Sequence, residues 1–381
     1  MDTLTVDTES KTKSVDVAVV GAGISGLACA AALVKAQYSV VIMDARPRSG
    51  GRLLSDQGVD LGASWSWPPY DTHVAALASR LGVLAVPQRL DGVAFHGRNQ
   101  VGNMGDRMAP CGPGAVRFQG GYAALPSALV QSLPPQALQL ETQVVALQAG
   151  DAGSINVEFN RLGNSFRGME SHDILRARRV VVAVPPGVHA ESIAYTPPLP
   201  QDQQRMMAST ATWCGDWCKV VAKFASPFWR QQGASGVAAT EGPVSIWWEG
   251  GGGTETGDEV NALIGLGVGD DTAAFENRMA SRNGNEELRS FVTATLGAVF
   301  GRDLVAEQLL SVRHKCWIAD PLTYAKGGQH RNYGHPLLKR PTPWGVHFAG
   351  TETEQDNGHV EGAIKAGERA AAEVAFALQQ Q

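Results

Sequence analysis

The chain has 381 residues, 44 of them Gly, with 44% apolar and only 18% charged residues, against about 7% Gly and about 25% charged residues in ordinary proteins. Ordinary amounts of large apolar residues exclude a disordered or fibrous chain, and the length permits two or three domains. A net charge of −5 without a block of Lys and Arg argues against a nucleic-acid partner.

The first predicted elements follow a polar leader. Residues 1–13 are mixed in charge, unlike a signal peptide, and are expected to be flexible. The uncharged run 17–34 is long enough for a membrane span, which is the alternative here. However, valines at 15–20 predict a strand, glycines then interrupt it, and an Ala-rich helix begins at Ile24. Strand, turn and helix explain the run better, so we expect a soluble, cytoplasmic protein without a membrane anchor.

The turn between this strand and helix carries the pattern G-x-G-x-x-G. In this pattern the first Gly permits a tight turn, the second lets a phosphate approach the backbone, and the third packs the helix on the strand. The next strand, 39–43, ends at Asp44, 18 residues past the last Gly, near the roughly 20 expected for a carboxylate that binds a ribose hydroxyl. We therefore expect a dinucleotide site with these residues: Gly21, Gly23, Ile24, Ser25, Gly26 and Asp44.

Three guanidinium groups around a Gly pair come next, and they suit a diphosphate. The segment contains Ala45, Arg46, Arg48, Gly51 and Arg52. With Asp44 in place of Glu, it resembles the Glu-Ala-Arg-x-Arg-x-Gly-Gly-Arg segment of the flavin-containing amine oxidase family, which includes the monoamine and polyamine oxidases. The resemblance implies FAD as the cofactor.

The resemblance recurs along the chain. Residues 60–65 look like the family's next flavin-contacting turn, and Val144, in the strand 138–147, matches a valine that lies against the adenine. Residues 348–363 resemble the C-terminal flavin-binding signature, in which a helix N-terminus stabilises the charge of the reduced flavin. The cofactor-binding residues implied by these matches are Gly62, Ala63, Ser64, Trp65, Val144, Gly350, Thr351, Glu352, Gly358, His359, Val360 and Ala363.

The family implies an α/β fold, in which a discontinuous Rossmann-like FAD-binding domain is interleaved with an α+β substrate domain of mixed sheet plus helices. We expect the FAD-binding domain at 14–72, 115–190 and 311–381, and the substrate domain at 73–114 and 191–310. Only about fifty residues separate the 60–65 turn from Phe118, where family members commonly carry a longer helical block. A less enclosed site is expected.

The resemblance also implies the reaction and two catalytic residues. Family members transfer a hydride from the α-carbon of an amine to flavin N5, and then yield an imine or aldehyde, ammonia and hydrogen peroxide. Lys219 matches the lysine that holds a water against N5, and Trp317 matches a tryptophan packed at the isoalloxazine. By pattern alone, Lys219 lies on an alternating strand where a lysine is ordinarily solvated, and Trp317 is ordinarily a core residue.

Two departures from the family concern the cofactor and the substrate. Ala325 stands where monoamine oxidases place the cysteine that binds flavin, so noncovalent FAD is expected. The two tyrosines that sandwich the amine fall on Lys326 and His359, so no aromatic cage is evident and a simple arylalkylamine is in doubt. The substrate is expected to be an amine or an amino acid, with oxygen as acceptor.

We expect a substrate pocket that includes Trp65, Trp213, Trp247, Lys326 and His359, with core packing as the alternative for each tryptophan. The nine His show no metal-ligand spacing, so no metal is expected. The five Cys show no paired spacing and are expected to be free thiols in a reducing compartment.

Two alternative functions stay open. One is a renalase-like or desaturase-like flavoprotein that oxidises NAD(P)H or a C–C bond; the missing tyrosine cage favours it and Lys219 opposes it. The other is a flavin-binding protein with little turnover. The exact substrate and the oligomeric state also stay open.

Overall fold

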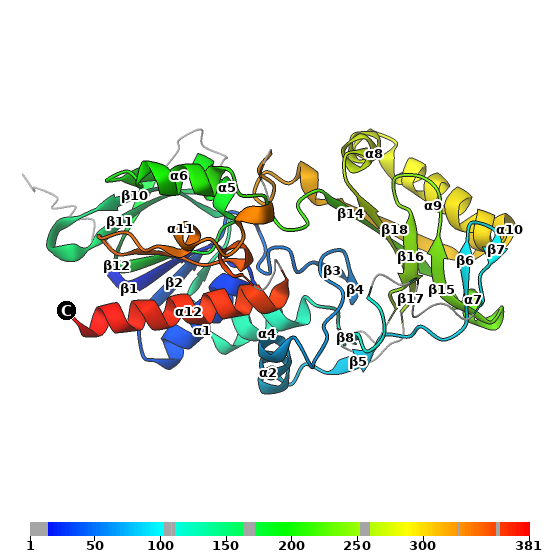
Figure 1. Ribbon diagram of the computed structural model, residues 1–381, viewed down its shortest axis with the longest axis horizontal. Coiled ribbons are helices and arrows are strands. Elements are labelled where there is room, and N and C mark those ends of the chain that lie inside the picture. The colour runs from blue at the N-terminus through cyan, green and yellow to red at the C-terminus, as the bar shows by residue number, and fades with distance from the viewer. Residues whose placement is uncertain are drawn as a thin grey trace, which may run out of the picture.

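The computed structural model describes residues 14–102, 108, 111–162, 172–251, 260–326, 328, 330–355 and 359–381. The predicted leader, 1–13, and Gly358 lie outside the described residues. Figure 1 shows an elongated molecule with a large sheet toward each end.

The first sheet has eight strands: β1 (Ser14–Val20), β2 (Val40–Met43), β9 (Leu138–Gln139), β10 (Thr142–Ala149), β11 (Ile155–Arg161), β12 (His172–Val182), β13 (Ala194–Thr196) and β19 (Val346–Phe348). Its order is β13-β10-β11-β12-β1-β2-β9, and β19 pairs with the end of β12. The pairs of β1 with β2 and β12, and of β12 with β19, are parallel.

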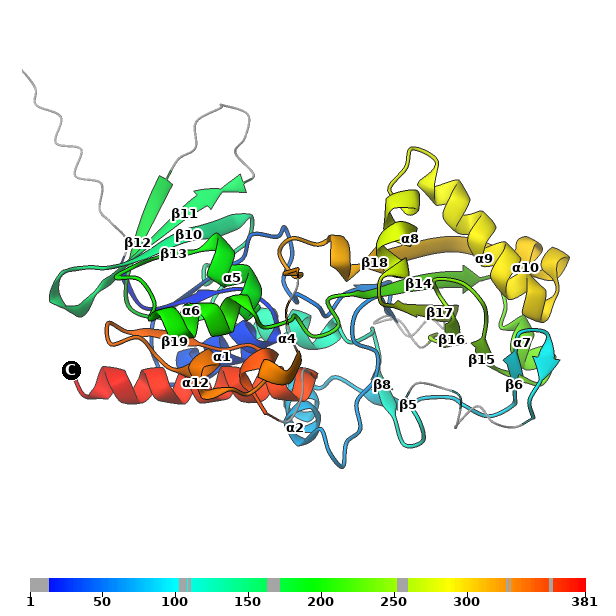
Figure 2. The same cartoon turned by 45° about the horizontal axis from the view of Figure 1, so that its top comes forward.

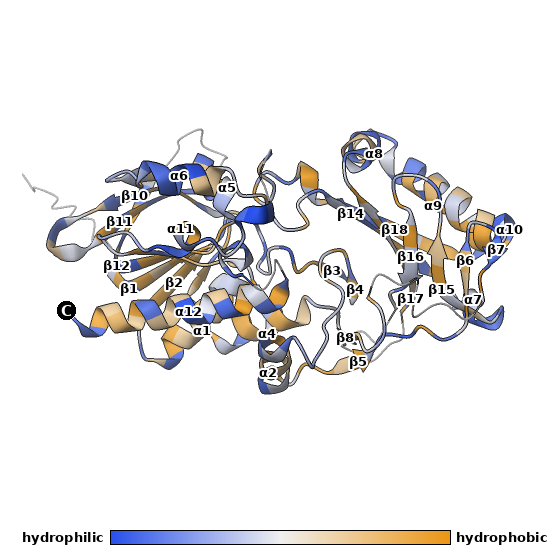
Figure 3. Cartoon of the chain, viewed as in Figure 1, coloured by the Kyte–Doolittle hydropathy of each residue, from blue (hydrophilic) through white to orange (hydrophobic). Residues whose placement is uncertain are grey.

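Strand β1 is apolar on both faces because both faces are covered. Val17 and Val19 belong to one core cluster, whereas Ala18 and Val20 belong to another on the opposite face. A nearly continuous apolar run is typical of such a central parallel strand, and Figure 3 colours β1 and β2 as hydrophobic. The predicted strand, turn and helix therefore account for the run 17–34. Among the described residues, no helix is long and apolar enough to cross a membrane.

Helices cover both faces of this sheet (Figures 1 and 2). Their bounds are α1 (Ile24–Lys35), α2 (Thr72–Leu81), α4 (Ala124–Ser132), α5 (Pro186–Ser192), α6 (Gln201–Ala208), α11 (Pro336–Lys339) and α12 (Val360–Gln379). Helices α1 and α12 lie side by side. Their approach depends on Gly367, because a Cβ there would lie 2.2 Å from the carbonyl oxygen of Ser25.

The second sheet has seven strands, ordered β18-β14-β17-β16-β15-β6-β7. Their bounds are β6 (Val93–His96), β7 (Asn99–Gln100), β14 (Trp217–Phe224), β15 (Ala234–Ala239), β16 (Ile246–Glu249), β17 (Asn261–Val268) and β18 (Leu309–Cys316). The helices at this end are α7 (Phe228–Gln231), α8 (Asp271–Met279), α9 (Gly284–Phe300) and α10 (Arg302–Gln308). Figure 2 shows α8 and α9 over one face of the sheet.

Short elements complete the chain. Two-stranded pairs are formed by β3 (Ser55–Asp56) with β4 (Val59–Asp60), and by β5 (Ala85–Pro87) with β8 (Val116–Phe118). Single 3-10 turns are η1 (Asp151–Gly153), η3 (Trp317–Ala319), η4 (His330–Asn332) and η5 (Thr351–Thr353).

Strand β14 alternates between two environments. Cys218, Val220 and Ala222 pack in the core under α9, whereas Val221 belongs to the cluster on the opposite face. The period of two residues along a strand therefore places Lys219 and Lys223 on the face away from the helices.

Two cysteines correct the expectation of free thiols. Cys218 and Cys316 lie opposite each other where β14 pairs with β18, and they form a disulfide. This pair could not be predicted from the sequence because 98 residues separate the two cysteines. Cys29, Cys111 and Cys214 are free.

Three segments pack against a different part of the fold from the one that the predicted domain boundaries assign to them. Strand β18 pairs with β14 in the seven-stranded sheet, β13 pairs with β10 in the eight-stranded sheet, and α2 contacts α12. The boundaries themselves stay a prediction.

Candidate active site

A cavity of about 340 Å³ is lined by residues from both ends of the molecule. Three lining turns follow parallel strands of the first sheet: Gly21 follows β1, Asp44 follows β2, and Gly350 comes shortly after β19. The carboxyl ends of parallel strands open at one edge of a sheet. Turns that are far apart in the sequence therefore meet at this cavity.

The turn after β1 is built from backbone in close contact. Gly21 has a φ of +103°, and a Cβ on Gly26 would lie 2.0 Å from the carbonyl oxygen of Gly21. Gly23, by contrast, has open space on its Cβ side. Asp44 fixes the turn, since Oδ2 accepts a hydrogen bond from the Ala22 N–H and Oδ1 accepts one from the Arg46 N–H, both at 2.8 Å.

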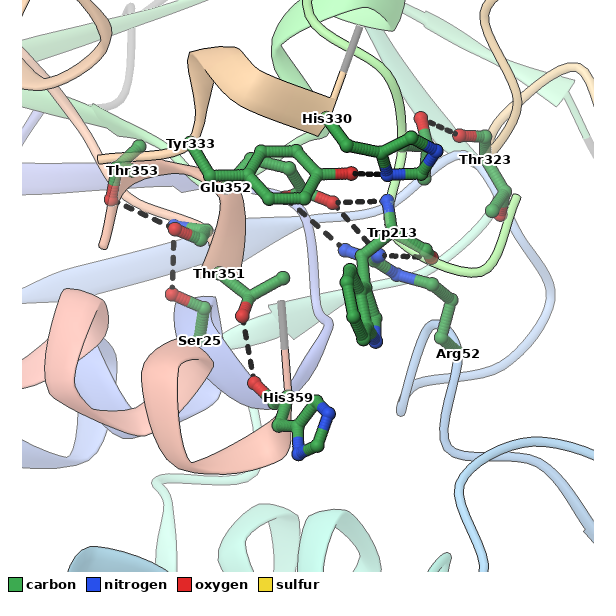
Figure 4. Close-up of polar contacts among 12 residues, drawn as sticks. Ser25, Arg52, Trp213, Thr323, His330, Tyr333, Thr351, Glu352, Thr353 and His359 are labelled. Carbon is green, nitrogen blue, oxygen red and sulfur yellow. Dashed lines mark hydrogen bonds and ion pairs between the residues drawn. The ribbon is translucent and has the colours of Figure 1, made fainter. Parts of the chain in front are cut away.

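Two helix N-termini point partial positive charge at this cavity. Neither Gly23, before α1, nor His359, before α12, caps its helix with a side-chain hydrogen bond. Uncapped N–H groups attract anions. The Gly350 N–H donates to Ser25 Oγ at 3.0 Å, which joins the two regions (Figure 4). This donor set suits an anionic cofactor such as a dinucleotide.

The two predicted catalytic side chains converge on one turn. Lys219 is only 5% exposed, and its Nζ donates to Ser64 Oγ at 2.6 Å and to the carbonyl oxygen of Gly62. Trp317 Nε1 donates to the neighbouring carbonyl oxygen of Leu61 at 3.3 Å. The predicted flavin-contacting turn is therefore held by both residues from the seven-stranded side.

Burial shifts the pKa values of two charged groups beside that turn, and the two charges interact. It lowers the pKa of Lys219 to about 8, while the negative charge of Asp60 opposes the shift. It raises the pKa of Asp60 to about 6, against hydrogen bonds from Ser55 and Tyr122 and the positive charge of Lys219. Near neutral pH a small change in surroundings can thus alter either charge.

A buried ion pair positions Trp213 (Figure 4). Glu352 is fully buried and accepts hydrogen bonds from Arg52 Nη1 at 2.8 Å and from the Trp213 N–H at 3.1 Å. Arg52 Nη1 also donates to the carbonyl oxygen of Trp213 at 2.8 Å. Both backbone groups of Trp213 are therefore fixed by residues of the predicted cofactor motifs.

Aromatic rings gather beside this pair. The ring centroid of His359 lies 5.2 Å from that of Trp213 and 6.2 Å from that of Trp67. Tyr333 and His330 pack edge-on against Trp213 at 5.9 and 6.3 Å. Trp213, His359 and Trp67 line the cavity, so an aromatic slot exists although the family tyrosines are absent.

Most of the predicted site residues line this one cavity. They are Gly21, Gly23, Ile24, Ser25, Asp44, Arg46, Gly51, Arg52, Gly62, Ala63, Ser64, Trp65, Trp213, Lys219, Trp317, Gly350, Thr351, Glu352, His359, Val360 and Ala363. Ala45 and Val144 line a smaller pocket that shares Gly21, Asp44 and Arg46 with the cavity. Gly26 lies under the turn.

Two predicted substrate residues are corrected. Trp247 is fully buried in the core with α8 and α9, and its Nε1 donates to Thr240 Oγ1 at 3.2 Å. The neighbouring Trp248, on the other face of β16, contacts Trp65 instead. Lys326 is exposed and does not line the cavity. These two predictions were wrong because tertiary packing decides which face of a strand meets the cavity and in which direction a loop runs.

Several cavity residues were not predicted from the sequence, Trp67 and Asp71 among them. Trp67 and Asp71 lie in the segment before α2, which the motif matches do not reach. An Asp directly before a helix ordinarily indicates a helix cap, so nothing in the sequence indicated that Asp71 would line the cavity. No group of three or more His, Cys, Asp or Glu side chains within the described ranges could hold a metal ion.

Comparisons with known proteins agree with this geometry. The fold and the cavity define a Rossmann-like dinucleotide-binding protein, and the model of the NAD(P)-binding Rossmann-like domain matches residues 19–81. The model of the flavin containing amine oxidoreductase family matches residues 94–375. The chain belongs to this family, and it is a flavin-dependent oxidoreductase that acts on CH–NH2 donors.

Two relatives align with this chain, one over most of its length and one over about two thirds of it. A Mycobacterium tuberculosis protein named "Putative flavin-containing monoamine oxidase AofH" is 26% identical over 460 aligned residues, which cover 96% of this chain and 97% of that protein. The alignment is longer than this chain, so the relative carries residues that are absent here. Putrescine oxidase of Kocuria rosea is 29% identical over 68% of this chain and 52% of its own length.

A solved structure shows the same fold. Cyclohexylamine oxidase from Brevibacterium oxydans has a TM-score of 0.74 at 22% identity, covering 96% of this chain and 99% of that structure. The two alternatives, oxidation of NAD(P)H or a C–C bond and flavin binding with little turnover, are not favoured by these matches.

Proposed function

We propose that the cavity holds noncovalent FAD and that the protein oxidises a small aliphatic amine with oxygen as the final acceptor. When bound, FAD accepts a hydride from the amine α-carbon, and the product imine hydrolyses to an aldehyde and ammonia. The observation that carries the proposal is the burial of Lys219 on the cavity wall, against a turn that lines the same cavity as two uncapped helix N-termini.

The residues present fit the cofactor. The turn around Gly23 leaves open space at the uncapped start of α1, which suits a pyrophosphate. Asp44 retains acceptor capacity for a ribose hydroxyl, and Val144 lines the adjoining pocket where adenine would lie. The N-terminus of α12 would face the isoalloxazine edge that becomes negative on reduction.

Noncovalent attachment is supported by the cysteines. Of the five, all of which are described, only Cys214 lines the cavity. Burial raises the pKa of its thiol to about 12, and a protonated thiol is a poor nucleophile. Ala325, at the family's attachment position, is buried.

The charges of the cavity favour an amine over an amino acid. Among the described residues, three basic side chains line it, and each has a partner: Arg46 pairs with Asp320, Arg52 pairs with Glu352, and Lys219 donates to Ser64. None of these three is left without a partner to bind a substrate carboxylate. The aromatic slot and the carboxylate of Asp71 suit an alkylamine, and two relatives are named for putrescine and cyclohexylamine.

The predicted cytoplasmic location is opposed by one feature. Disulfides are rare in reducing compartments, and the Cys218–Cys316 bond argues for an oxidising one.

The test begins with the purified protein. We expect a yellow protein whose flavin stays in the supernatant after acid precipitation. Flavin that stays in the pellet would refute noncovalent binding, and Cys214→Ala would then identify the attachment. Anaerobic mixing with putrescine or cyclohexylamine should bleach the flavin, and air should then produce hydrogen peroxide. Bleaching by NADH alone would contradict the proposal.

A matched pair of variants tests the lysine. Lys219→Met should slow flavin reduction or reoxidation at least about tenfold, because it removes a positioned proton donor from the cavity. Lys223→Met is the control: Lys223 lies on the same face of β14, bonded to Asp56 at 2.6 Å, and does not line the cavity. Equal rates in both half-reactions for Lys219→Met and the wild type would remove Lys219 from the mechanism.

A further inference from the structure

His359 places a titratable ring in the aromatic slot. Its backbone is fixed at the start of α12, where the carbonyl oxygen accepts a hydrogen bond from Thr351 Oγ1 at 2.7 Å (Figure 4). The ring contacts both Trp213 and Trp67, and the residue lines the cavity. No described residue hydrogen-bonds to its ring nitrogens. One nitrogen of the neutral ring is thus available to accept a proton from a bound molecule.

Asp71 supplies a fixed negative charge beside this ring. Its Oδ2 accepts hydrogen bonds from Ser66 Oγ at 2.9 Å and from the Trp67 N–H at 2.8 Å. Both Asp71 and His359 line the cavity. Burial lowers the pKa of His359, and the charge of Asp71 opposes that shift.

Other charged or titratable groups on the described elements around the ring already have partners. Glu361 of α12 accepts from backbone N–H groups at the start of α2, His73 of α2 pairs with Glu368, Arg52 pairs with Glu352, and His330 bonds to Tyr333. The Cys214 thiol stays protonated, because burial raises its pKa to about 12.

We propose that His359 is the base that removes a proton from the ammonium form of the substrate, with Asp71 as its positioning residue. This proposal rests on the proposed amine oxidation. It assigns to this chain a proton acceptor that a tyrosine at the same position would not provide near neutral pH.

The step is needed because the amine arrives protonated. An alkylammonium resembles the lysine side chain, with a pKa of about 10.4, so roughly one molecule in 2,500 is neutral at pH 7. The α-carbon loses a hydride readily only when nitrogen has a free electron pair. The N–H bond of the ammonium breaks, its electron pair stays on nitrogen, and the proton bonds to the free ring nitrogen of His359. The carboxylate of Asp71 stabilises the resulting imidazolium, which then releases the proton to water.

Other cavity groups suit this step less well. Lys219 is bonded to Ser64 and Gly62. One carboxylate oxygen of Asp71 already accepts hydrogen bonds from Ser66 and Trp67, whereas the imidazole of His359 has a free ring nitrogen and belongs to the side-chain type that exchanges protons near neutral pH.

The test is the pH dependence of anaerobic flavin reduction, measured by stopped flow with putrescine and cyclohexylamine. In the wild type the limiting rate should rise with pH as His359 loses its proton and then level off below pH 8. In His359→Ala it should be about 100-fold lower at pH 7 and rise tenfold per pH unit with the neutral amine. Added imidazole should restore the rate in a concentration-dependent way.

Two further variants separate charge from structure. Asp71→Asn keeps the oxygen that accepts from Ser66 and Trp67 but removes the charge, so the acid limb of the profile should move to lower pH. His73→Asn is the control; His73 lies two residues from Asp71 and does not line the cavity, and its profile should match the wild type. Flavin absorbance per chain shows whether each variant keeps its cofactor.

Each outcome decides the proposal. If neither amine bleaches the wild-type flavin, the proposed function and this inference both fail. If the amine bleaches the flavin and His359→Ala keeps the wild-type pH profile, only the inference fails. If His359→Ala is slower than the wild type, is not rescued by imidazole and keeps the wild-type pH profile, His359 has a structural role and the inference is wrong. Should His359→Ala lose its flavin, His359→Gln provides the same measurement.

Discussion

The two ends of the molecule build the cavity in different ways. The glycine turns of the eight-stranded side form a backbone wall: Gly21, Gly51 and Gly350 have positive φ, and the helices α1 and α12 present N–H groups. The rest is a side-chain wall, with Lys219 and Trp317 from the seven-stranded side and with Asp71 and His359 from the segments before α2 and α12. A backbone wall recognises a constant cofactor, whereas a side-chain wall can change substrate without changing the fold.

The largest expected effect concerns the side-chain wall. The Cys218–Cys316 disulfide joins the two strands next to Lys219 and Trp317 and closes a loop of 98 residues. Cys218→Ser with Cys316→Ser should lower the free energy of unfolding by about 4 kcal/mol, as measured by urea denaturation. Cys214→Ser is the control, with little expected change. A denatured, unreduced wild type should show three free thiols, and five would contradict the bond.

The second prediction tests the backbone wall with two neighbouring glycines. Gly26→Ala should cost about 3 kcal/mol, since the new Cβ meets the carbonyl of Gly21 at 2.0 Å. Gly23→Ala should change the stability of the flavin-free protein by less than about 1 kcal/mol, because its Cβ side is open. Gly23→Ala should nevertheless retain less flavin per chain. Equal denaturation midpoints for the two variants would show that the wall tolerates side chains.

The third prediction concerns the charge between the walls. Burial raises the pKa of Asp60 from 3.8 to about 6, so between these values the folded protein binds a proton that the unfolded chain releases. Stability should therefore fall as pH rises from 4 to 6, by roughly 2–3 kcal/mol in total.

In Asp60→Asn that decline should disappear, because the amide does not ionise and its oxygen can still accept from Ser55 and Tyr122. The comparison is a set of unfolding curves at half-unit steps of pH. Asp151→Asn, at an exposed turn, should keep the wild-type decline. A decline of equal size in Asp60→Asn would assign it to other groups.

The backbone wall could be predicted from the sequence almost residue by residue. The requirements of a tight turn and of close helix packing admit few residues other than Gly at positions such as Gly21 and Gly26, so the local sequence carries the geometry. Lys219 and Trp317 were found through the family resemblance, and the structure places both on the cavity.

The side-chain wall could be predicted only in part. Trp213 and Trp247 look alike as sequence, but Trp213 is held in the cavity by Glu352, 139 residues away, and Trp247 points into the core. Asp71 and the Cys218–Cys316 pair likewise depend on long-range contacts. Such contacts are decided by how the sheets pack, which no local pattern encodes.

The bond between Ser25 and Gly350 has a consequence for synthesis. These residues are 325 positions apart, and at about 5–20 residues per second a ribosome needs roughly 16–65 s to pass from one to the other. During that interval the first glycine turn has neither the strand β19 nor the helix α12 beside it. The part of the cavity wall that includes Gly350 and the start of α12 is therefore complete only after nearly the whole chain has been synthesised, so the proposed cofactor can bind there only late in synthesis or after it.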